Sequence, residues 1–448
     1  MTSMAIPLIT YPECDALRIG PNELHLSNPE LYDVIYSQNH HFIKDDYYYS
    51  GFPSHTLFTE TNREKHRERR KLLSRPFSTQ TIVGMQSIMD RRADKLCDKI
   101  SEVGLGGVVH LYQAARLFTS DIISEYAFEK SFNFLDQIKD RTFHVPFLDM
   151  FDATLLSVVD LTYNPMLRRT AQLLPMSMLK LLNKRVAEFA NFFKMIDIAQ
   201  EEFFTKKSTS KQGQSTSIFG PLSHLTTQQI IDEAVDIIAA GSDTTATALG
   251  NLFVHVLKSP RITRKLVAEI DQAMPDRSQA CSLAKLEQLE YLSACIKETL
   301  RLTPSVVSRL PRVVPAIGSG VTPLVVDGKV IPQGTVVGMS QRSMHFDEEF
   351  WGDAPFEFRP ERWIEGNPKQ LEKRFVTFGK GARLCLGINL AYAELRIATA
   401  KLLRRFSFSE DSTMTEEDME QLDCFNVAFK GSGPRVVVKA ERWSDDLE

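Results

Sequence analysis

The chain has 448 residues, 43% hydrophobic and 25% charged, a balance that excludes a wholly disordered or fibrous protein. Its formal net charge of −4 does not suggest a nucleic-acid-binding protein. Six cysteines without a Cys-x-x-Cys pair exclude a disulfide scaffold and a zinc ribbon, and they fit a reducing, intracellular compartment.

The first part of the chain predicts a strand, a helix and a loop in turn. Leu24–Leu26 predict a short strand, and the residues from Ser27 onward predict a helix. Residues 45–60 are aromatic and rich in turn formers, which predicts a loop. Asn62–Leu73 combine helical periodicity with many basic side chains.

Helical periodicity dominates the middle of the chain, from about residue 80 to 205. The polar, low-complexity stretch 205–217 predicts a mobile surface loop. A long helix is expected from Thr226 to Lys258, with a capping box formed by Thr226 and Gln229. At about 1.5 Å per residue this helix would span a domain, so we expect it to be central.

Strand signals concentrate late in the chain. They follow a helix that ends near Arg301 and include a hairpin with its turn at Asp327–Gly328. A last helix is expected over 388–405. The sequence therefore predicts a mainly α protein with a small β-rich part, in which residues 1–448 form a single domain.

A glycine-rich loop, FGKGARLCLG, leads into the last helix and carries Cys385. The helix N-terminus, Lys380 and Arg383 are expected to lower the pKa of this thiol from about 8.5. Gly381 and Gly387 would leave room for a flat cofactor. Taken alone, the pattern supports two interpretations equally well: a metal-binding thiolate or a small buried cysteine. A phosphate loop is disfavoured because leucine stands where a third glycine belongs.

Three further patterns are ambiguous when taken singly. Ala240–Thr245 interrupts the long helix with an acid beside a hydroxyl, which could relay protons or could be a packed kink. Glu298 and Arg301 share a helix face, as a buried pair or a weak surface pair. His66 and Arg70 could hold an anionic group or belong to a solvated basic helix.

Together and in this order, these motifs resemble the cytochrome P-450 haem-thiolate monooxygenases. Phe378–Gly387 matches the family pattern F-x-x-G-x-R-x-C-x-G, and Ala240–Thr245 matches [AG]-G-x-[DE]-T-[TS]. Glu298 and Arg301 match E-x-x-R, and Pro360–Trp363 matches P-E-R-[FW]. The segments DDYYYSGFP, HRERRKLLSRPFS and CLGINLAYAEL are similar to fungal members of the trichodiene-oxygenase type. That subgroup is rich in enzymes of terpenoid, mycotoxin and other secondary metabolism.

The resemblance implies the P-450 fold, with the long central helix over a haem b whose iron is held by the Cys385 thiolate. Asp243 and Thr244 would deliver the protons consumed by O–O cleavage. The other haem-binding residues implied are His66, Arg70, Ala240, Gly241, Arg312, Phe378, Gly381, Arg383 and Gly387. Those that would face the haem propionates are His66, Arg70, Arg312 and Arg383.

The implied reaction inserts one oxygen atom from dioxygen into a lipophilic small molecule. The electrons would come from NADPH through a separate NADPH–cytochrome P-450 reductase, since the chain has no flavin or nicotinamide motif. The expected docking face comprises two basic segments, Arg63–Arg75 at +5 and Leu371–Arg405 at +6, including Lys380 and Arg404. The expected pocket-lining segments, with few charges, are 45–60, about 150–205, Ile237–Thr245 and Ser305–Ser308.

The resemblance also implies a buried ion-pair cluster of Glu298, Arg301 and Arg362 under the cysteine loop. Two alternatives remain. A haem-thiolate isomerase or dehydratase would not need the Asp243–Thr244 pair, and a catalytically inactive haem-binding relative would need none of the chemistry. The family implies a location at the surface of the endoplasmic reticulum. Neither a secretory signal nor an N-terminal membrane anchor is apparent, so at most peripheral membrane contact is expected. The first helix of the fold is also expected to be missing.

Overall fold

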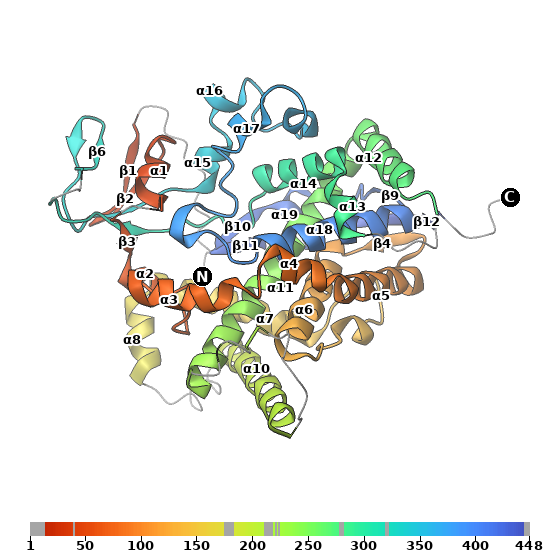
Figure 1. The fold of residues 1–448 in the computed structure, drawn as a ribbon, viewed down its shortest axis with the longest axis horizontal. Helices are drawn as coiled ribbons and strands as arrows, with labels where there is room; N and C mark the ends of the chain where they lie inside the picture. The colour runs from red at the N-terminus through yellow and green to blue at the C-terminus, as the bar shows by residue number, and fades with distance from the viewer. Residues whose placement is uncertain are drawn as a thin grey trace.

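The computed structural model describes residues 14–38, 41–173, 183–209, 218–219, 222, 225–276, 282–318 and 322–442. Helices dominate this part of the chain, and its strands gather into small sheets (Figure 1). The predicted fold class, mainly α with a small β-rich part, is confirmed.

The elements are as follows. The longer helices are α3 (Arg63–Ser74), α5 (Gln86–Gly104), α6 (Leu111–Phe128), α7 (Pro146–Tyr163), α8 (Pro165–Leu173), α10 (Lys184–Thr209), α11 (Thr227–Leu257), α12 (Pro260–Ala273), α14 (Glu290–Leu302) and α18 (Ile388–Arg405). The shorter helices and 3-10 turns are α1 (Leu31–Tyr36), α2 (Asp46–Tyr49), α4 (Thr79–Gly84), η1 (Phe134–Gln137), α13 (Leu283–Glu287), α15 (Gln341–His345), α16 (Glu348–Trp351), η3 (Pro360–Trp363), α17 (Pro368–Leu371), η4 (Gly381–Arg383) and α19 (Glu416–Met419). The strands are β1 (Ala16–Gly20), β2 (Glu23–Leu26), β3 (Ile43–Lys44), β4 (Gly107–Val109), β5 (Arg312–Val313), β6 (Val325–Val326), β7 (Lys329–Val330), β8 (Val336–Gly338), β9 (Phe406–Glu410), β10 (Gln421–Cys424), β11 (Asn426–Phe429) and β12 (Val436–Glu441).

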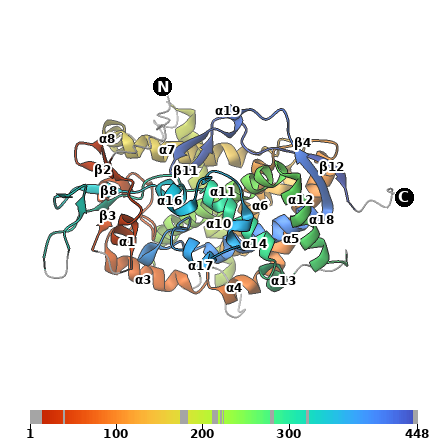
Figure 2. The same cartoon turned by 90° about the horizontal axis from the view of Figure 1, so that it is seen from above.

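Helix α11 runs through the middle of the molecule and packs against α6, α10, α14 and α18 (Figures 1 and 2). The predicted capping box is present, with reciprocal hydrogen bonds between Thr226 and Gln229. Close packing against α6 depends on Gly241, because a Cβ there would lie 2.7 Å from Cγ1 of Ile123. The main hydrophobic core surrounds this helix.

The largest described sheet has the strand order β1-β2-β8-β5-β3, in which only β2 and β8 are parallel. It packs around a second core that is separate from the helical one. Strands β6 and β7 form the predicted hairpin. Asp327 and Gly328 have φ of +50° and +72°, as a mirror-image two-residue turn requires.

Local expectations near the N-terminus need small corrections. The predicted strand over Leu24–Leu26 is confirmed, but the helix after it begins at Leu31 rather than at Ser27. The delay arises because the side chain of Asn28 accepts a hydrogen bond from the Glu30 N–H and forms a turn first. The expected loop at 45–60 also contains the short helix α2, capped by an aspartate.

The prediction of a loop over 205–217 is wrong for residues 205–209, because α10 continues to Thr209. The lysines in this stretch are good helix formers and extend the final turns. Residues 210–217 lie outside the described part of the chain. Among the residues that are described, no helix is both long and apolar enough to cross a bilayer.

Candidate active site

Cys385 lies at the end of a tight loop that leads into α18. Its N–H donates to the carbonyl of Phe378 over 2.8 Å, and Gly379 turns the chain with a φ of +72°. The thiol is exposed to open space, yet surrounding protein raises its pKa above the usual value through burial. The thiol therefore faces an internal space rather than the outer surface.

The start of α18 lowers the pKa of Cys385 as expected, but the expected net lowering is wrong, because burial raises this pKa by more. Burial outweighs the N–H groups at the start of α18 and the Arg70 guanidinium, which favour the thiolate. Lys380 turns outward and pairs with an aspartate of α1 at 2.9 Å. Arg383 donates instead to the carbonyl of Glu60 over 2.6 Å. Although Lys380 and Arg383 are close to Cys385 in sequence, their charged groups bind other residues rather than lying beside the sulfur.

Gly381 and Gly387 serve different purposes. A Cβ at Gly381 would lie 2.4 Å from the Tyr36 carbonyl oxygen and 2.8 Å from the Gln38 nitrogen, so this glycine permits a backbone crossing. A Cβ at Gly387 would meet only Sγ of Cys385, at 4.0 Å. Of the two, only Gly387 keeps the space beside the thiol open.

A cavity of 740 Å³ borders the cysteine loop, and we call it the cation-lined cavity. Basic side chains from β3, α3, β5 and the loop converge on it, although they are distant in sequence. They include Lys44, His66, Arg70, Arg312 and Arg383. The structure thus brings together all four residues that the sequence assigned to anionic groups of a cofactor.

These basic groups lower one another's pKa values. Burial, with repulsion from neighbouring cations, lowers the pKa of His66 to about 3 and that of Lys44 well below its usual value. The same causes lower the pKa of Arg383 to about 10. Nε of Arg312 is buried and has no hydrogen-bond partner among the described residues. Such a cluster fits a ligand that brings negative charge.

Lys44 was missed by sequence reasoning, because a lone lysine in a two-residue strand carries no motif. It reaches the cavity because β3 pairs with β5, which sets it opposite Arg312. Phe378 and Gly387 do not line this cavity. Phe378 instead packs on Tyr392 and borders a separate cavity of 330 Å³ behind the loop.

Asp243 is fully buried and engaged by other side chains. The hydroxyl of Tyr112 donates to Oδ1 over 2.8 Å, and Nε of Arg116 lies 3.2 Å from the same oxygen. Asn426 donates to Oδ2 over 3.5 Å. Burial raises the pKa of Asp243, and Arg116 and Tyr112 oppose that rise. Sequence reasoning missed these three partners, which come from α6 and β11.

Thr244 keeps its hydroxyl on its own helix, where Oγ1 donates to the Ala240 carbonyl over 2.9 Å. Its carbonyl accepts from the Ser305 hydroxyl over 2.6 Å. Ala240 is exposed even though α11 is central, so this face of the helix borders an internal space. The segment after α14 therefore contacts α11 at Thr244, next to Asp243.

Glu298 and Arg301 are completely buried, so the alternative of a solvated surface pair is excluded. Glu298 accepts two hydrogen bonds from Arg301, at 2.8 and 3.0 Å, one from Nε of Arg362 at 2.8 Å and one from Nε1 of Trp363 at 2.9 Å. Because one carboxylate receives donors from both α14 and η3, this cluster ties the two segments together.

His345 links the same cluster to the segment just before the cysteine loop and was not foreseen from the sequence. Its Nδ1 lies 2.9 Å from the Arg301 carbonyl, and its Nε2 accepts from the Val376 N–H over 3.0 Å. These partners require the neutral ring with hydrogen on Nδ1. Burial lowers the pKa of His345 to about 3, which maintains that form.

Residues 16–434 match the family model described as cytochrome P450. The chain belongs to the cytochrome P450 family. The cytochrome P450 monooxygenase claJ of Penicillium crustosum is 30% identical over 443 residues, which cover 95% of this chain and 99% of the relative. The N-acetyltryptophan 6-hydroxylase ivoC of Emericella nidulans is 31% identical, covering 95% and 84%.

The similarity extends to solved structures. The heme domain of cytochrome P450DA superposes with a TM-score of 0.75 over 95% of this chain and 90% of that chain, at 18% identity, which establishes the P450 fold. The chain is thus a P450 monooxygenase of a haem-binding family, as the sequence predicted. These comparisons do not bear on the trichodiene-oxygenase subgroup.

An aromatic cluster lies beside the cation-lined cavity of this P450. The rings of Phe52, Phe58 and Phe425 are in mutual contact, with centroids 5.1–5.2 Å apart. Lys44 lies 4.2 Å from the Phe58 ring, which joins the cluster to the cavity. Phe425 comes from the β10–β11 turn, outside the segments predicted to line the pocket, and has a φ of +74°. The cluster is mostly hydrocarbon and carries no charge of its own.

The expected docking face needs one correction. Arg404 is buried and donates to the carbonyls of Met274 and Asp276, so it offers no surface charge. Two other basic residues of α18, Lys401 and Arg405, pair with acids of α5. Helix α3, which borders the cysteine loop, presents a row of exposed cations. They are Arg63, Lys65, Arg67 and Lys71, and the C-cap residue Arg75 adds one more.

Proposed function

We propose that this P450 monooxygenase inserts one oxygen atom of dioxygen into a lipophilic small molecule of fungal secondary metabolism, of terpenoid or mycotoxin type. The observation that carries the substrate class is the uncharged aromatic cluster of Phe52, Phe58 and Phe425 beside the cavity. A mostly hydrocarbon surface favours apolar ligands. A relative named fusicoccadiene C-8 hydroxylase, from Alternaria brassicicola, is 30% identical over 87% of this chain, which supports the terpenoid type.

The residues present fit haem b as the cofactor. Basic side chains that converge on one cavity suit the two propionates, and so does Nε of Arg312, which has no hydrogen-bond partner in the described part of the chain. The Cys385 thiol faces an internal space, where it would hold the haem iron as a thiolate. Haem with a thiolate ligand supplies activation of dioxygen by electrons from a reductase. We assign Lys44 to the propionate side together with His66, Arg70, Arg312 and Arg383.

In this proposal the Thr244 hydroxyl holds a proton for the reaction, after rotating away from the Ala240 carbonyl. Asp243 supports it from the buried side of α11, where Arg116 and Tyr112 fix the carboxylate. Ser305 helps to position the local backbone through its bond to the Thr244 carbonyl. A group that holds a proton within reach of the reacting oxygen acts as a general acid.

Thr244→Ala should separate oxygen use from product formation. We expect haem content and substrate affinity to stay normal, while product per NADPH falls roughly tenfold or more and hydrogen peroxide rises, since general acid catalysis contributes about 10²-fold or more. Thr170→Ala is a matched control, because Thr170 makes the same bond to a carbonyl four residues earlier but lies exposed on α8. Unchanged coupling in Thr244→Ala would assign this threonine to the helix kink alone.

The substrate class is tested by a ligand screen on the haem-loaded protein, read as Soret shifts and followed by product analysis. Terpenoid hydrocarbons should shift the band and yield oxygenated products that require NADPH, reductase and dioxygen. Selective binding of charged, hydrophilic compounds would contradict the lipophilic class. Conversion without NADPH and dioxygen would indicate an isomerase or dehydratase, and binding without any conversion would indicate an inactive relative.

The proposed electron donor is NADPH–cytochrome P450 reductase, docking on the cations of α3. Reversing two exposed charges one turn apart, as Lys71→Glu with Arg75→Glu, should slow haem reduction roughly tenfold at low salt. The difference should shrink as salt rises, because screening acts beyond about 8 Å at physiological ionic strength. Lys329→Glu on the β6–β7 hairpin should have no effect. Equal reduction rates at all salt concentrations would exclude α3 as the docking face.

A further inference from the structure

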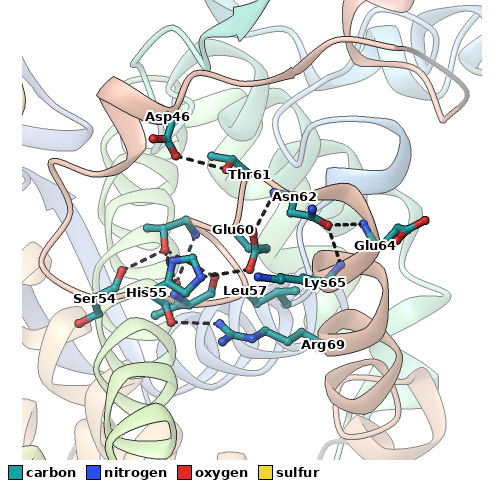
Figure 3. A network of polar contacts seen from close by, with 12 residues as sticks. Asp46, Ser54, His55, Leu57, Glu60, Thr61, Asn62, Glu64, Lys65 and Arg69 are labelled. Carbon is teal, nitrogen blue, oxygen red and sulfur yellow. Dashed lines mark hydrogen bonds and ion pairs between the residues drawn. The ribbon is translucent and has the colours of Figure 1, made fainter.

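Residues 54–60 form a tightly bonded segment between α2 and α3, which we call the 54–60 loop (Figure 3). Oγ1 of Thr59 accepts from the Thr56 N–H over 2.8 Å and donates to the Ser54 carbonyl over 2.9 Å. Nε2 of His55 lies 3.1 Å from Oε2 of Glu60. These internal bonds make the loop a unit that would attach or detach as a whole.

One side of the loop is attached to α11 by two carboxylates. Oγ1 of Thr56 donates to Asp236 over 2.8 Å, and the Leu57 N–H donates to Glu233 over 2.9 Å. Nη1 of Arg69, on α3, donates to the same Glu233 oxygen over 3.1 Å and to the His55 carbonyl over 3.0 Å. Glu233 is buried, and these contacts come from two different segments.

The other side of the loop borders the cation-lined cavity. Arg383 donates to the Glu60 carbonyl over 2.6 Å, and Lys44 lies over the Phe58 ring at 4.2 Å. Both cations line the cavity. The 54–60 loop therefore spans the distance between α11 and the cavity rim, and its detachment from α11 would open that rim.

We infer that Glu233 and Asp236 are positioning residues for the monooxygenase reaction: they hold the 54–60 loop closed on α11 and set how readily it opens. They touch the loop rather than the expected cofactor, so they act on catalysis through it. The inference rests on the proposed function only in taking the cavity as the haem site.

Burial raises the pKa values of both carboxylates by more than the nearby basic groups lower them. Burial, then repulsion from Asp236, raises the pKa of Glu233 to about 8 against the attraction of Arg69. Asp232 adds further repulsion. Burial raises the pKa of Asp236 to about 6, opposed by the Thr56 hydroxyl, by Lys44 and by a backbone N–H of the loop. Near neutral pH the pair therefore retains one proton.

Opening the loop would expose both carboxylates to water. The pKa of Glu233 would then return toward its ordinary value of 4.5. Because the closed state then has the higher pKa, a rise in pH favours the open state. Between pH 7 and 9 a change in pKa from 8 to 4.5 raises the open-to-closed ratio roughly tenfold. Asp236 is already ionised in both states over this range and contributes little.

Hydrogen–deuterium exchange of the haem-loaded protein tests this inference without any catalysis. After correction for intrinsic rates, amides of residues 54–60 should exchange roughly tenfold faster at pH 9 than at pH 7. In Glu233→Gln, which keeps an acceptor oxygen but does not titrate, this increase should vanish. Thr56→Val should raise exchange at both pH values and keep the increase.

Asp232→Asn is the matched control, because Asp232 lies beside Glu233 but accepts its hydrogen bond from Gln228 rather than from the loop. It should keep most of the pH dependence. Rebinding of carbon monoxide after flash photolysis should accelerate with pH in the wild type and not in Glu233→Gln. Exchange at 54–60 that is independent of pH in the wild type, or an unchanged increase in Glu233→Gln, would overturn the inference. Failure of the monooxygenase assay alone would leave these results intact and would instead overturn the proposed function.

Discussion

Cys385→Ala should abolish monooxygenase activity and remove the thiolate-type Soret band of the reduced carbon-monoxide complex. Cys385 is the cysteine that ends the glycine-rich loop, and its thiol faces the internal space beside Gly387. Alanine removes the sulfur but adds no bulk, so the chain should still fold. The measurements are the carbon-monoxide difference spectrum, haem content and product formation.

Cys97→Ala is the matched control for this loss. Cys97 is also a free cysteine, but it is buried in α5, where burial keeps its thiol protonated. The variant should keep the thiolate-type band and its activity, at a cost in stability of about 1 kcal/mol for the smaller side chain. A normal spectrum in Cys385→Ala, or loss of the band in Cys97→Ala, would contradict the assignment of the ligand.

Glu298→Ala should give little haem-loaded protein. Removing this carboxylate leaves Arg301 fully buried without its ion-pair partner and removes acceptors for Arg362 and Trp363. Loss of one partner of a buried pair costs about 3–5 kcal/mol. That is a large share of the roughly 5–15 kcal/mol by which domains are stable. The expected result is a large fall in yield, haem content and melting temperature.

Glu290→Ala provides the comparison on the same helix. Glu290 lies exposed in the first turn of α14, where an acid contributes about 0.3–1 kcal/mol through the helix dipole. It should express with normal haem content. Glu298→Gln should fall between the two, because the amide keeps one acceptor oxygen but loses the charge. Near-normal haem content in Glu298→Ala would show that the cluster does not support the fold.

The motif residues could be assigned from the sequence because their spacing is local. The E-x-x-R spacing of Glu298 and Arg301 sets both on one face of a helix whatever surrounds it, and their pairing follows. The capping box of α11 and the Asp327–Gly328 turn are local in the same sense. For such elements the backbone geometry depends on neighbouring residues alone, so the predictions agree with the structure.

The environment of those residues was less predictable. Basic neighbours in sequence suggested a low pKa for the Cys385 thiol, whereas Lys380 and Arg383 bond elsewhere and burial raises it. Arg404 counted as a surface charge but is buried. In both cases the sign or value of an electrostatic effect depends on desolvation, which only the packed chain defines.

The fold class followed from helical periodicity, caps and turn residues, and the family followed from the resemblance of the motifs, because all of these signals lie within short segments. Only the tertiary structure placed Lys44 among the cations, Tyr112 and Arg116 on Asp243, and the 54–60 loop on Glu233 and Asp236. These contacts join residues up to hundreds of positions apart. They depend on which surfaces meet when the core is buried, and single side chains carry no local signal of their distant partners.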